Sequence, residues 1–272
     1  QATIKPDEVS TELEAARRAV GSSRDLAWFV QTAVRELGGV AAAMRNRNSQ
    51  TSALSVDGKL AIDLALTPRA FRDQLGTLKS EGVGRFTAPV GAGEWLLHRA
   101  HPLVEALAGY VVDTTIDPKA EAPIARRCGV MRTSAVTRRT TLLMLRARYH
   151  LAARRRDEHE LLAEEALLLA FTGSVTEPVW LEPVAVESLL GAEPAGNVAE
   201  GQAREFLSQV LEGLPDLEPA IVGRLEAQAE ALRDAHQRVR AAAAGTGGYT
   251  SVTAQLPFDL VGLYVYLPVP KA

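Results

Sequence analysis

The chain has 272 residues, of which 47% are hydrophobic and 23% are charged, and its formal net charge is −3. This length allows one large domain or two ordinary ones with a substantial core. No run approaches the roughly 18 apolar residues that a membrane span needs, which argues against a membrane role. The single cysteine, Cys128, excludes an internal disulfide framework and predicts a reducing, cytoplasmic setting.

The first part of the chain predicts helices and short strands in alternation. Residues 6–19 have acids early and arginines late, as the helix dipole favours. Because the sequence starts without Met and close to this helix, the chain is expected to be a piece of a longer protein. A second helix is expected over residues 22–37. The pair Asp57-Gly58, between two alternating runs, predicts a hairpin.

Residues 67–75 predict a short helix with threonine as N-cap and proline in the first turn. A strand is expected at residues 84–90. A longer helix should follow over residues 102–117, with His101 at the N-cap position.

An arginine-rich stretch, residues 126–156, contains ten arginines and no acid. Residues 140–151 alternate between two faces and predict a long strand. Residues 160–171 favour a helix on intrinsic propensity alone. The polar segment between the two runs could equally be the tip of a hairpin, and a hairpin is the favoured interpretation.

Helical patterns dominate the rest of the chain, over residues 198–212 and 216–244, and two short strands are expected at the end, the last one buried. The predicted fold class is α+β, with an antiparallel sheet that contains the long Arg-rich hairpin. Several helices should pack on it, including one long helix near the C-terminus. The expected division is a subdomain over residues 1–122 and another over 123–272, or one continuous unit.

Motifs for catalysis are missing from the sequence. It has no phosphate-binding GxxxxGK[ST] loop and no GxSxG nucleophile motif. The acidic run at residues 157–160 is expected to be a loop, and Cys128 a passive cysteine. His98 and His101 have a spacing that suits a metal, but a capping role is favoured because no third ligand follows. The expectation is therefore no catalytic residue, no metal site and no cofactor in this chain.

The arginines are the main functional candidates. Guanidinium groups on a β-hairpin suit phosphate contacts. Without those ten charges, however, the rest of the chain carries about −13, so pairing with acids of the same molecule is the rival interpretation. The candidate nucleic-acid-binding residues are Arg126, Arg127, Arg132, Arg138, Arg139, Arg146 and Arg148. The first five are expected near strand ends, and the last two on one strand face.

Four segments carry a family resemblance: "WLLHRAHPLVEALAGYVVDTTIDP", "RTSAVTRRTTLLMLRARYHL", "LLAEEALLLAF" and "AHQRVRAAAAGTGGYTSVTAQLPFDLVGLYVYLP". Together they resemble the C-terminal region of bacterial Swi/Snf-family helicase-like ATPases, relatives of the RNA-polymerase-associated ATPase. The resemblance runs from about Asp25 to the C-terminus. It implies that two RecA-like motor lobes lie upstream and use ATP and Mg while tracking along double-stranded nucleic acid. No helicase motif is present here, so no catalytic residue carries over.

The expected function is that of a non-catalytic accessory domain of such a DNA helicase or translocase, which positions or regulates the motor. Its expected partners are the motor lobes of the same parent chain, duplex DNA, and RNA polymerase or another protein. The alternative is a protein-interaction module that docks on the motor lobes or a partner without touching nucleic acid. Arginines paired with Glu164, Glu165 or helix acids would favour this alternative, and unpaired arginines would favour nucleic acid.

Overall fold

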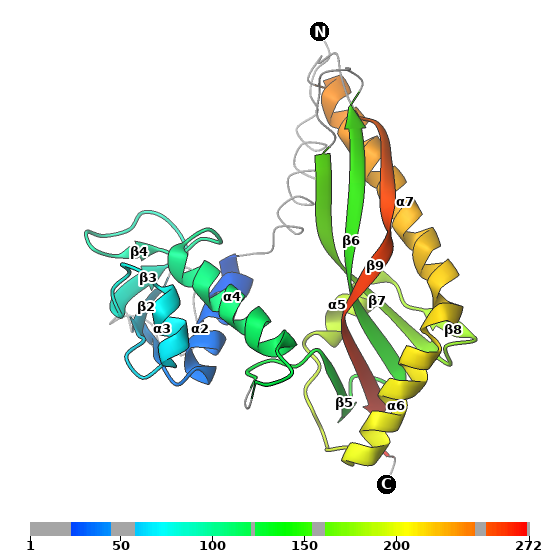
Figure 1. Ribbon diagram of the computed structural model, residues 1–272, viewed down its shortest axis with the longest axis horizontal. Coiled ribbons are helices and arrows are strands. Elements are labelled where there is room, and N and C mark those ends of the chain that lie inside the picture. The colour runs from blue at the N-terminus through cyan, green and yellow to red at the C-terminus, as the bar shows by residue number, and fades with distance from the viewer. Residues whose placement is uncertain (1–22, 45–57, 121–122, 154–160, 243–248, 271–272) are drawn as a thin grey trace. The chain divides into compact units, whose positions relative to one another are not determined.

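The structure is a computed structural model, and it describes residues 23–44, 58–120, 123–153, 161–242 and 249–270 (Figure 1). The chain forms two compact units, and the boundary between them lies at Arg126/Arg127. The predicted α+β class is confirmed: both units combine helices with a mixed sheet. No helix in the described ranges combines the length and the apolarity that a membrane crossing requires.

The first unit is a small four-stranded sheet with three described helices. Its elements are α2 (Ser23–Glu36), β1 (Val40–Met44), β2 (Lys59–Asp63), α3 (Arg69–Gln74), β3 (Glu81–Arg85), β4 (Trp95–Leu96) and α4 (Pro102–Ile116). The strands lie in the order β1-β2-β3-β4; the first two pairings are antiparallel and the third is parallel.

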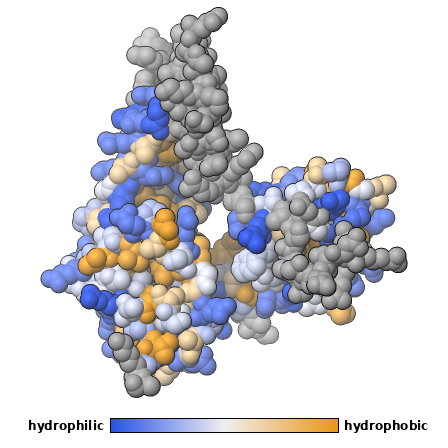
Figure 2. Space-filling view, turned by 180° about the vertical axis from the view of Figure 1, so that it is seen from behind, coloured by the Kyte–Doolittle hydropathy of each residue, from blue (hydrophilic) through white to orange (hydrophobic). Residues whose placement is uncertain are grey.

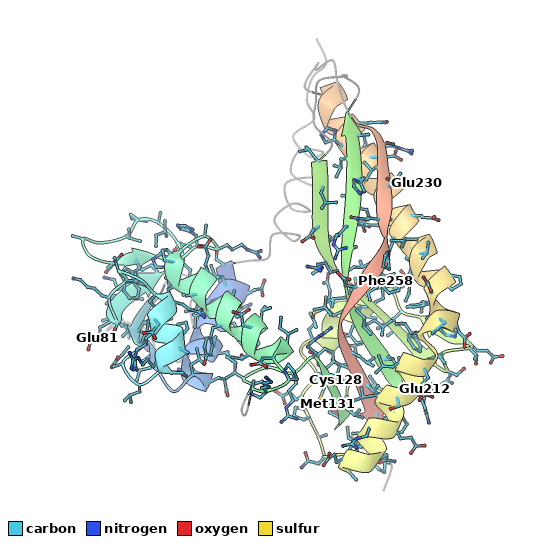
Figure 3. All side chains as sticks on the ribbon, viewed as in Figure 1. Glu81, Cys128, Met131, Glu212, Glu230 and Phe258 are labelled. Carbon is cyan, nitrogen blue, oxygen red and sulfur yellow. The ribbon has the colours of Figure 1, made fainter. Side chains whose placement is uncertain are left out.

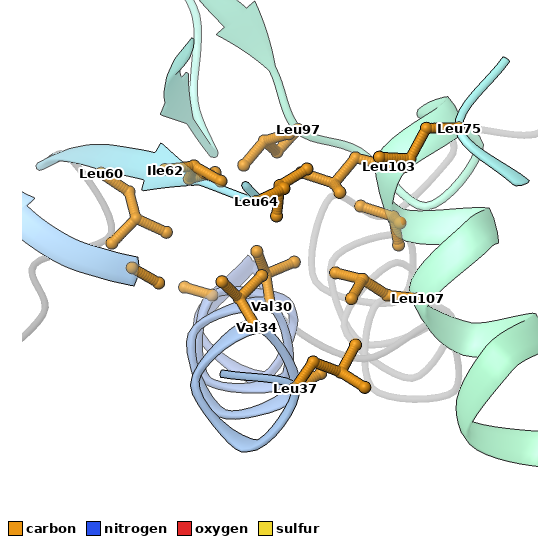
Figure 4. Close-up of a cluster of buried hydrophobic side chains, with 14 of the residues drawn as sticks. Val30, Val34, Leu37, Leu60, Ile62, Leu64, Leu75, Leu97, Leu103 and Leu107 are labelled. Atoms are coloured by element: carbon orange, nitrogen blue, oxygen red, sulfur yellow. The ribbon is translucent and has the colours of Figure 1, made fainter. Parts of the chain in front are cut away.

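The core of the first unit lies where α2, α4 and the sheet meet (Figure 4). Val30 and Val34 of α2 and Leu107 of α4 are completely buried there against leucines from the strands. The spacing of apolar residues in α2 is amphipathic and places them on one face. α4 is apolar on most of its surface, and its Val112 and Ile116 are more than half exposed. His101 is the N-cap of α4 as predicted, and its Nδ1 accepts a hydrogen bond of 3.2 Å from the Leu103 amide.

The second unit is built on a five-stranded sheet. Its elements are β5 (Cys128–Thr133), β6 (Thr140–Ala153), β7 (Leu161–Gly173), β8 (Pro178–Trp180), α5 (Pro183–Leu189), α6 (Glu200–Glu212), α7 (Leu214–Ala242) and β9 (Tyr249–Pro268). The strand order is β5-β9-β6-β7-β8, and only the pairing of β5 with β9 is parallel. The last strand of the chain therefore lies inside the sheet (Figure 1).

The predicted Arg-rich hairpin is present as β6 and β7. Their antiparallel register runs without interruption from Thr140↔Thr172 to Leu151↔Leu161. Residues 161–171, which favour a helix on propensity alone, form a strand because β6 pairs along their whole length, and tertiary context commonly overrides propensity in this way. The expected hairpin tip, residues 154–160, lies outside the described residues.

The long helix predicted near the C-terminus is α7, which runs along one face of the sheet (Figure 1). It buries Leu217, Ile221 and Leu225 against alternate residues of β6 and β9. Phe258 of β9 packs against this cluster between the strand and the helix, whereas Glu230 is on the exposed side of α7 (Figure 3).

The opposite face of the sheet is covered only in part. Val186 and Leu189 of α5 pack there on Leu142 and Ala170, which lie at the end where β8 joins the sheet. Seen from behind, hydrophobic residues gather over the lower half of this unit and hydrophilic residues are more frequent above (Figure 2). The upper part, made by the far halves of β6, β7 and β9, carries the charged residues considered below.

Two strand predictions do not match the structure. The strand expected at residues 84–90 overlaps β3 (Glu81–Arg85) only at its first two residues. The last residues were expected to form two short strands, but they form one strand of 20 residues, β9. Proline inside a strand normally interrupts its pairing, and β9 accommodates Pro257 at an irregular point in its pairing with β6. The short elements β5, β8 and α5 were not predicted at all. The helix predicted at residues 6–19 and the first run of the hairpin predicted at Asp57-Gly58 lie outside the described residues.

Candidate functional site

The candidate site is the charged face of the sheet, which consists of Arg146, Arg148 and His150 of β6 with their neighbours on β7 and β9. Side chains alternate along a strand, so these three residues share the face opposite α7. Arg146 and His150 are exposed and Arg148 is half-buried. The sequence correctly predicted that the two arginines share one strand face.

Asp259 of β9 binds both arginines. Arg146 donates to its Oδ2 atom from Nε at 2.9 Å and from Nη2 at 2.6 Å. The Nη2 of Arg148 contacts the same oxygen. In addition, the Nε of Arg148 donates to the Oε1 of Glu164 on β7 at 3.2 Å. Two cations and two carboxylates thus form a network across three strands, with no net charge.

The contact between Arg146 and Asp259 shifts the pKa of both residues. The hydrogen bond from Arg146 lowers the pKa of Asp259, and the positive charges of Arg148 and Arg146 add to this effect. The same hydrogen bond raises the pKa of Arg146, helped by the charges of Asp259 and Glu164. Both shifts favour the ionised forms of Arg146 and Asp259, so this ion pair persists near neutral pH.

The register explains how one carboxylate reaches both arginines. Arg146 faces Asp259, but Arg148 faces Gln255, so residues 256–258 of β9 oppose Ala147 alone. An irregularity of this kind bends a strand and redirects its side chains. It lies at the site, beside the two charged positions of β6.

The arginines near strand ends mostly bind backbone carbonyl groups. Arg127 donates to the carbonyls of Leu260 at 2.6 Å and Val261 at 2.8 Å, and Arg132 donates to that of Pro268 at 3.2 Å. These contacts tie β5 to β9, its neighbour in the sheet.

Two further candidates lie at the start of β6. Arg139 donates to the carbonyl of Gly173 at 3.0 Å and packs its guanidinium over the ring of Phe206 of α6. Arg138 is exposed: its carbonyl accepts a hydrogen bond of 3.0 Å from the Thr140 hydroxyl, and its side chain has no partner in the described part of the chain. Arg126 is exposed and has a partner. The seven candidate arginines are thus dispersed: Arg126 ends the first unit, and the other six lie at several positions of the second. Arg146 and Arg148 share Asp259 as a partner.

Other residues that the sequence singled out show no reactive arrangement. The rings of His98 and His101 lie 6.1 Å apart, and burial together with the charge of His98 lowers the pKa of His101. Cys128 is a free, exposed thiol on β5 (Figure 3). Within the described ranges, no group of three or more His, Cys, Asp or Glu side chains is placed to hold a metal ion.

Sequence reasoning missed two residues of this region. The first is Asp259, whose only signal is that it is the one acid in a long apolar terminal run. The second is Tyr149, which lies on the other face of the strand, in the core cluster with residues of α7. Its side chain is fully buried, and its hydroxyl has no hydrogen-bond partner among the described residues. Burial, and secondarily the charge of Glu165, raises the pKa of Tyr149 to about 12.

The fold and the site define the second unit as an α+β sheet module whose most charged face is neutralised internally. The chain belongs to the family described as "Domain of unknown function (DUF8741)", whose model matches residues 115–272. The matched range begins near the end of α4 and includes the whole second unit, so the network of Arg146, Arg148, Asp259 and Glu164 lies inside the family domain. No curated protein matches the chain.

Proposed function

We propose that this chain is a non-catalytic accessory region of a bacterial, cytoplasmic ATPase of the Swi/Snf type. In this proposal the second unit is a packing module that docks on the motor lobes or on a partner protein. Support for the parent comes from the resemblance of segments such as "HPLVEALAGYVVD" and "LPFDLVGLYVYLP". ATP and Mg would be used by the motor lobes, and no residue of this chain is assigned to bind them.

The observation that carries the packing role is the neutral network on β6. Phosphate binding gains much of its free energy when cationic side chains release the counterions of the nucleic acid. Arg146 and Arg148 already have Asp259 and Glu164 as partners, so a phosphate would have to displace a carboxylate and would meet its negative charge. The arginines therefore act mainly as cross-strand ties, which hold β7, β6 and β9 as a rigid surface.

The test against nucleic acid is the anisotropy of a labelled DNA duplex, titrated with the 272-residue chain at about 50 mM and about 200 mM salt. We expect no binding that weakens steeply with salt. The matched variant, Arg146→Gln with Arg148→Gln, should behave like the wild-type chain in this assay. Steep, salt-dependent binding that this double variant abolishes would overturn the packing role.

The docking part is tested with the motor lobes of a Swi/Snf-type ATPase that carries this region, produced separately from the chain. Calorimetry measures whether the two parts associate, and ATP hydrolysis by the lobes is followed with and without the chain. We expect a saturable complex and a changed rate of hydrolysis. If the parts neither associate nor change the rate, the motor is not the partner.

A second candidate function is contact with nucleic acid through the strand-end arginines. Arg138 favours it, because this side chain is exposed and unpaired within the described residues. In the same anisotropy assay, a contact of this kind would be lost in Arg138→Gln and kept in the double variant of Arg146 and Arg148. The two variants therefore separate the two functions.

A further inference from the structure

The sheet of the second unit has a long open edge along β7. On one side, β7 pairs with β6 over its length, from Thr172 back to Leu161. On the other side, β8 pairs only with residues 171–173 of β7. No strand in the described part of the chain pairs with that side of Leu161–Leu169, which we call the open edge.

The direction of the backbone groups along the open edge follows from one hydrogen bond. The amide of Leu181 donates to the carbonyl of Ala170 at 2.8 Å, on the side away from β6. In an antiparallel strand, the N–H and C=O groups of one residue point to the same side, and successive residues alternate. The uninterrupted register with β6 keeps this alternation. The outward groups of the open edge are therefore those of Leu162, Glu164, Ala166 and Leu168.

The other edges of this sheet carry features that discourage pairing. β8 has three residues, and β5 is bridged on its outer side, where Arg132 pairs with Gly196. The free half of β9 contains Pro257 and the irregular register with β6. Short strands, proline, bulges and charged side chains are the usual protections of an edge. Of these, the open edge of β7 has only the charges of Glu164 and Glu165, and Leu161 and Leu162 at its start are each more than half exposed.

The carboxylates of the open edge determine which charge an added strand should carry. Glu164 and Glu165 lie at its centre. Glu165 accepts only long contacts of 3.4 and 3.5 Å from the neutral Gln228, and Glu164, although paired with Arg148, keeps half of its side chain exposed. A second copy paired about this centre would set Glu164 against Glu164, or Glu165 against Glu165. Like charges directly opposite each other destabilise a sheet, whereas opposite charges stabilise it.

We propose that the open edge of β7 is a docking site for an extended segment of another protein, which has adjacent basic residues flanked by β-forming residues. This inference rests on the proposed function, since it specifies how the packing module binds protein. The bound segment would add a strand beside β7, accept and donate hydrogen bonds at the four outward residues, and place its basic side chains beside Glu164 and Glu165.

The probe is a synthetic peptide of about nine residues, alternating Thr and Val with two central lysines, and its control has two glutamates instead. Binding to the full chain is followed by anisotropy and by amide hydrogen exchange. In the free chain the amides of Leu162, Glu164, Ala166 and Leu168 should exchange fast. The lysine peptide should protect these four amides, and the glutamate peptide should not.

Two variants of one residue test the edge itself. Ala166→Pro removes an outward N–H but no hydrogen bond to β6, so the sheet is kept and affinity for the lysine peptide should fall about tenfold. Ala166→Val keeps the N–H and should bind as the wild-type chain does. Replacing both Glu164 and Glu165 by Gln should weaken the lysine peptide by about tenfold and remove its advantage over the glutamate peptide.

Several results would overturn the inference. The first is that Ala166→Pro binds the lysine peptide as tightly as the wild-type chain does. The second is that the wild-type chain does not bind the lysine peptide. The third is that the peptide protects amides other than the four outward ones. Protection of these amides in the free monomer would mean that the chain already covers its own edge. Self-association that Ala166→Pro abolishes would make a second copy the occupant.

The DNA assay above separates this inference from the proposed function. Duplex binding that the double variant of Arg146 and Arg148 abolishes, together with the expected peptide results, would leave the edge inference standing and reject the packing role. No duplex binding and no peptide binding would leave the packing role standing and reject the edge.

Discussion

At the scale of single residues, Tyr149 is a large core side chain that carries a buried polar group. Its ring fills the space between the sheet and α7, but its hydroxyl is buried without a partner within the described residues. A buried polar group without a hydrogen bond costs its full desolvation free energy. The hydroxyl therefore lowers the stability of the second unit.

Removal of this hydroxyl should stabilise the protein. We expect Tyr149→Phe to raise the free energy of unfolding by about 1 kcal/mol, measured by urea denaturation. Tyr266→Phe is the control. Tyr266 is also buried, but its hydroxyl, unlike that of Tyr149, is not among the buried polar atoms that lack a partner. A loss of stability in Tyr149→Phe would show that the hydroxyl has a partner in the folded protein.

His101 gives the first unit a pH-dependent helix cap. Its neutral Nδ1 accepts the hydrogen bond from Leu103, and burial, followed by the charge of His98, lowers its pKa below the ordinary 6.5. The unfolded chain therefore binds the proton more readily than the folded one, so the cap's stabilisation is present above pH 6.5 and is lost as pH falls through the lowered value.

The test compares the wild-type chain with His101→Asn, which keeps a capping side chain that does not titrate. Unfolding free energies between about pH 7 and pH 5 should fall more steeply for the wild-type chain. Equal slopes in the two proteins would show that His101 does not couple the cap to pH.

At the scale of elements, α7 holds the sheet by a narrow apolar stripe. Ile221 is fully buried against the strands, whereas Leu232 on the same helix is 37% exposed. We expect Ile221→Ala to cost about 3 kcal/mol, as buried aliphatic truncations commonly do, and Leu232→Ala to cost less than about 1 kcal/mol. Urea denaturation followed by circular dichroism measures both, and equal costs would contradict the packing described.

Elements with a strong local pattern could be predicted from the sequence. The alternation in residues 140–151 predicted β6. The caps and the apolar spacing predicted α2, α4 and α7, and the predicted ends lie within a few residues of the observed ones. Prediction from the sequence failed where tertiary pairing overrides a local preference. Proline normally interrupts a strand, but β9 continues through Pro257 because it pairs with β6 on both sides of it. Short elements such as β8 have too few residues to produce a periodicity.

The site was only partly predictable, for a different reason. The strand face of Arg146 and Arg148 follows from alternation within one strand. Their shared partner, Asp259, is more than a hundred positions away, and it becomes their neighbour only through the register of β6 with β9. Since that register includes an irregularity, no spacing in the sequence specifies it.

At the scale of the whole molecule, the two units have separate hydrophobic cores. One core gathers residues up to Leu107, with Ile124 packed against it, and the other two clusters begin at Val130 and later. Among the described residues, none belongs to both a first-unit and a second-unit cluster. The division therefore coincides with a division of the core, and each core should stabilise mainly its own unit.

Native-state hydrogen exchange can measure the two stabilities in one chain. Leu107→Ala should lower the protection of slow amides in the first unit by about 3 kcal/mol and leave the second unchanged, and Leu143→Ala should do the reverse. Both leucines are fully buried, so the pair is matched. If either substitution lowered both units equally, the chain would unfold as one cooperative body.

The place of β9 also has a consequence for how the protein is made. A ribosome produces β5, β6, β7 and β8 before it reaches β9, yet β9 must lie between β5 and β6. During this interval β5 has no partner strand, and one side of β6 is exposed, in a nascent chain whose N-terminal unit can already fold. The residues of β9 therefore complete the sheet at an interior position. A ribosome that stopped before Tyr249 would release a chain whose unpaired strand edges favour aggregation, and chaperones or proteases would remove it.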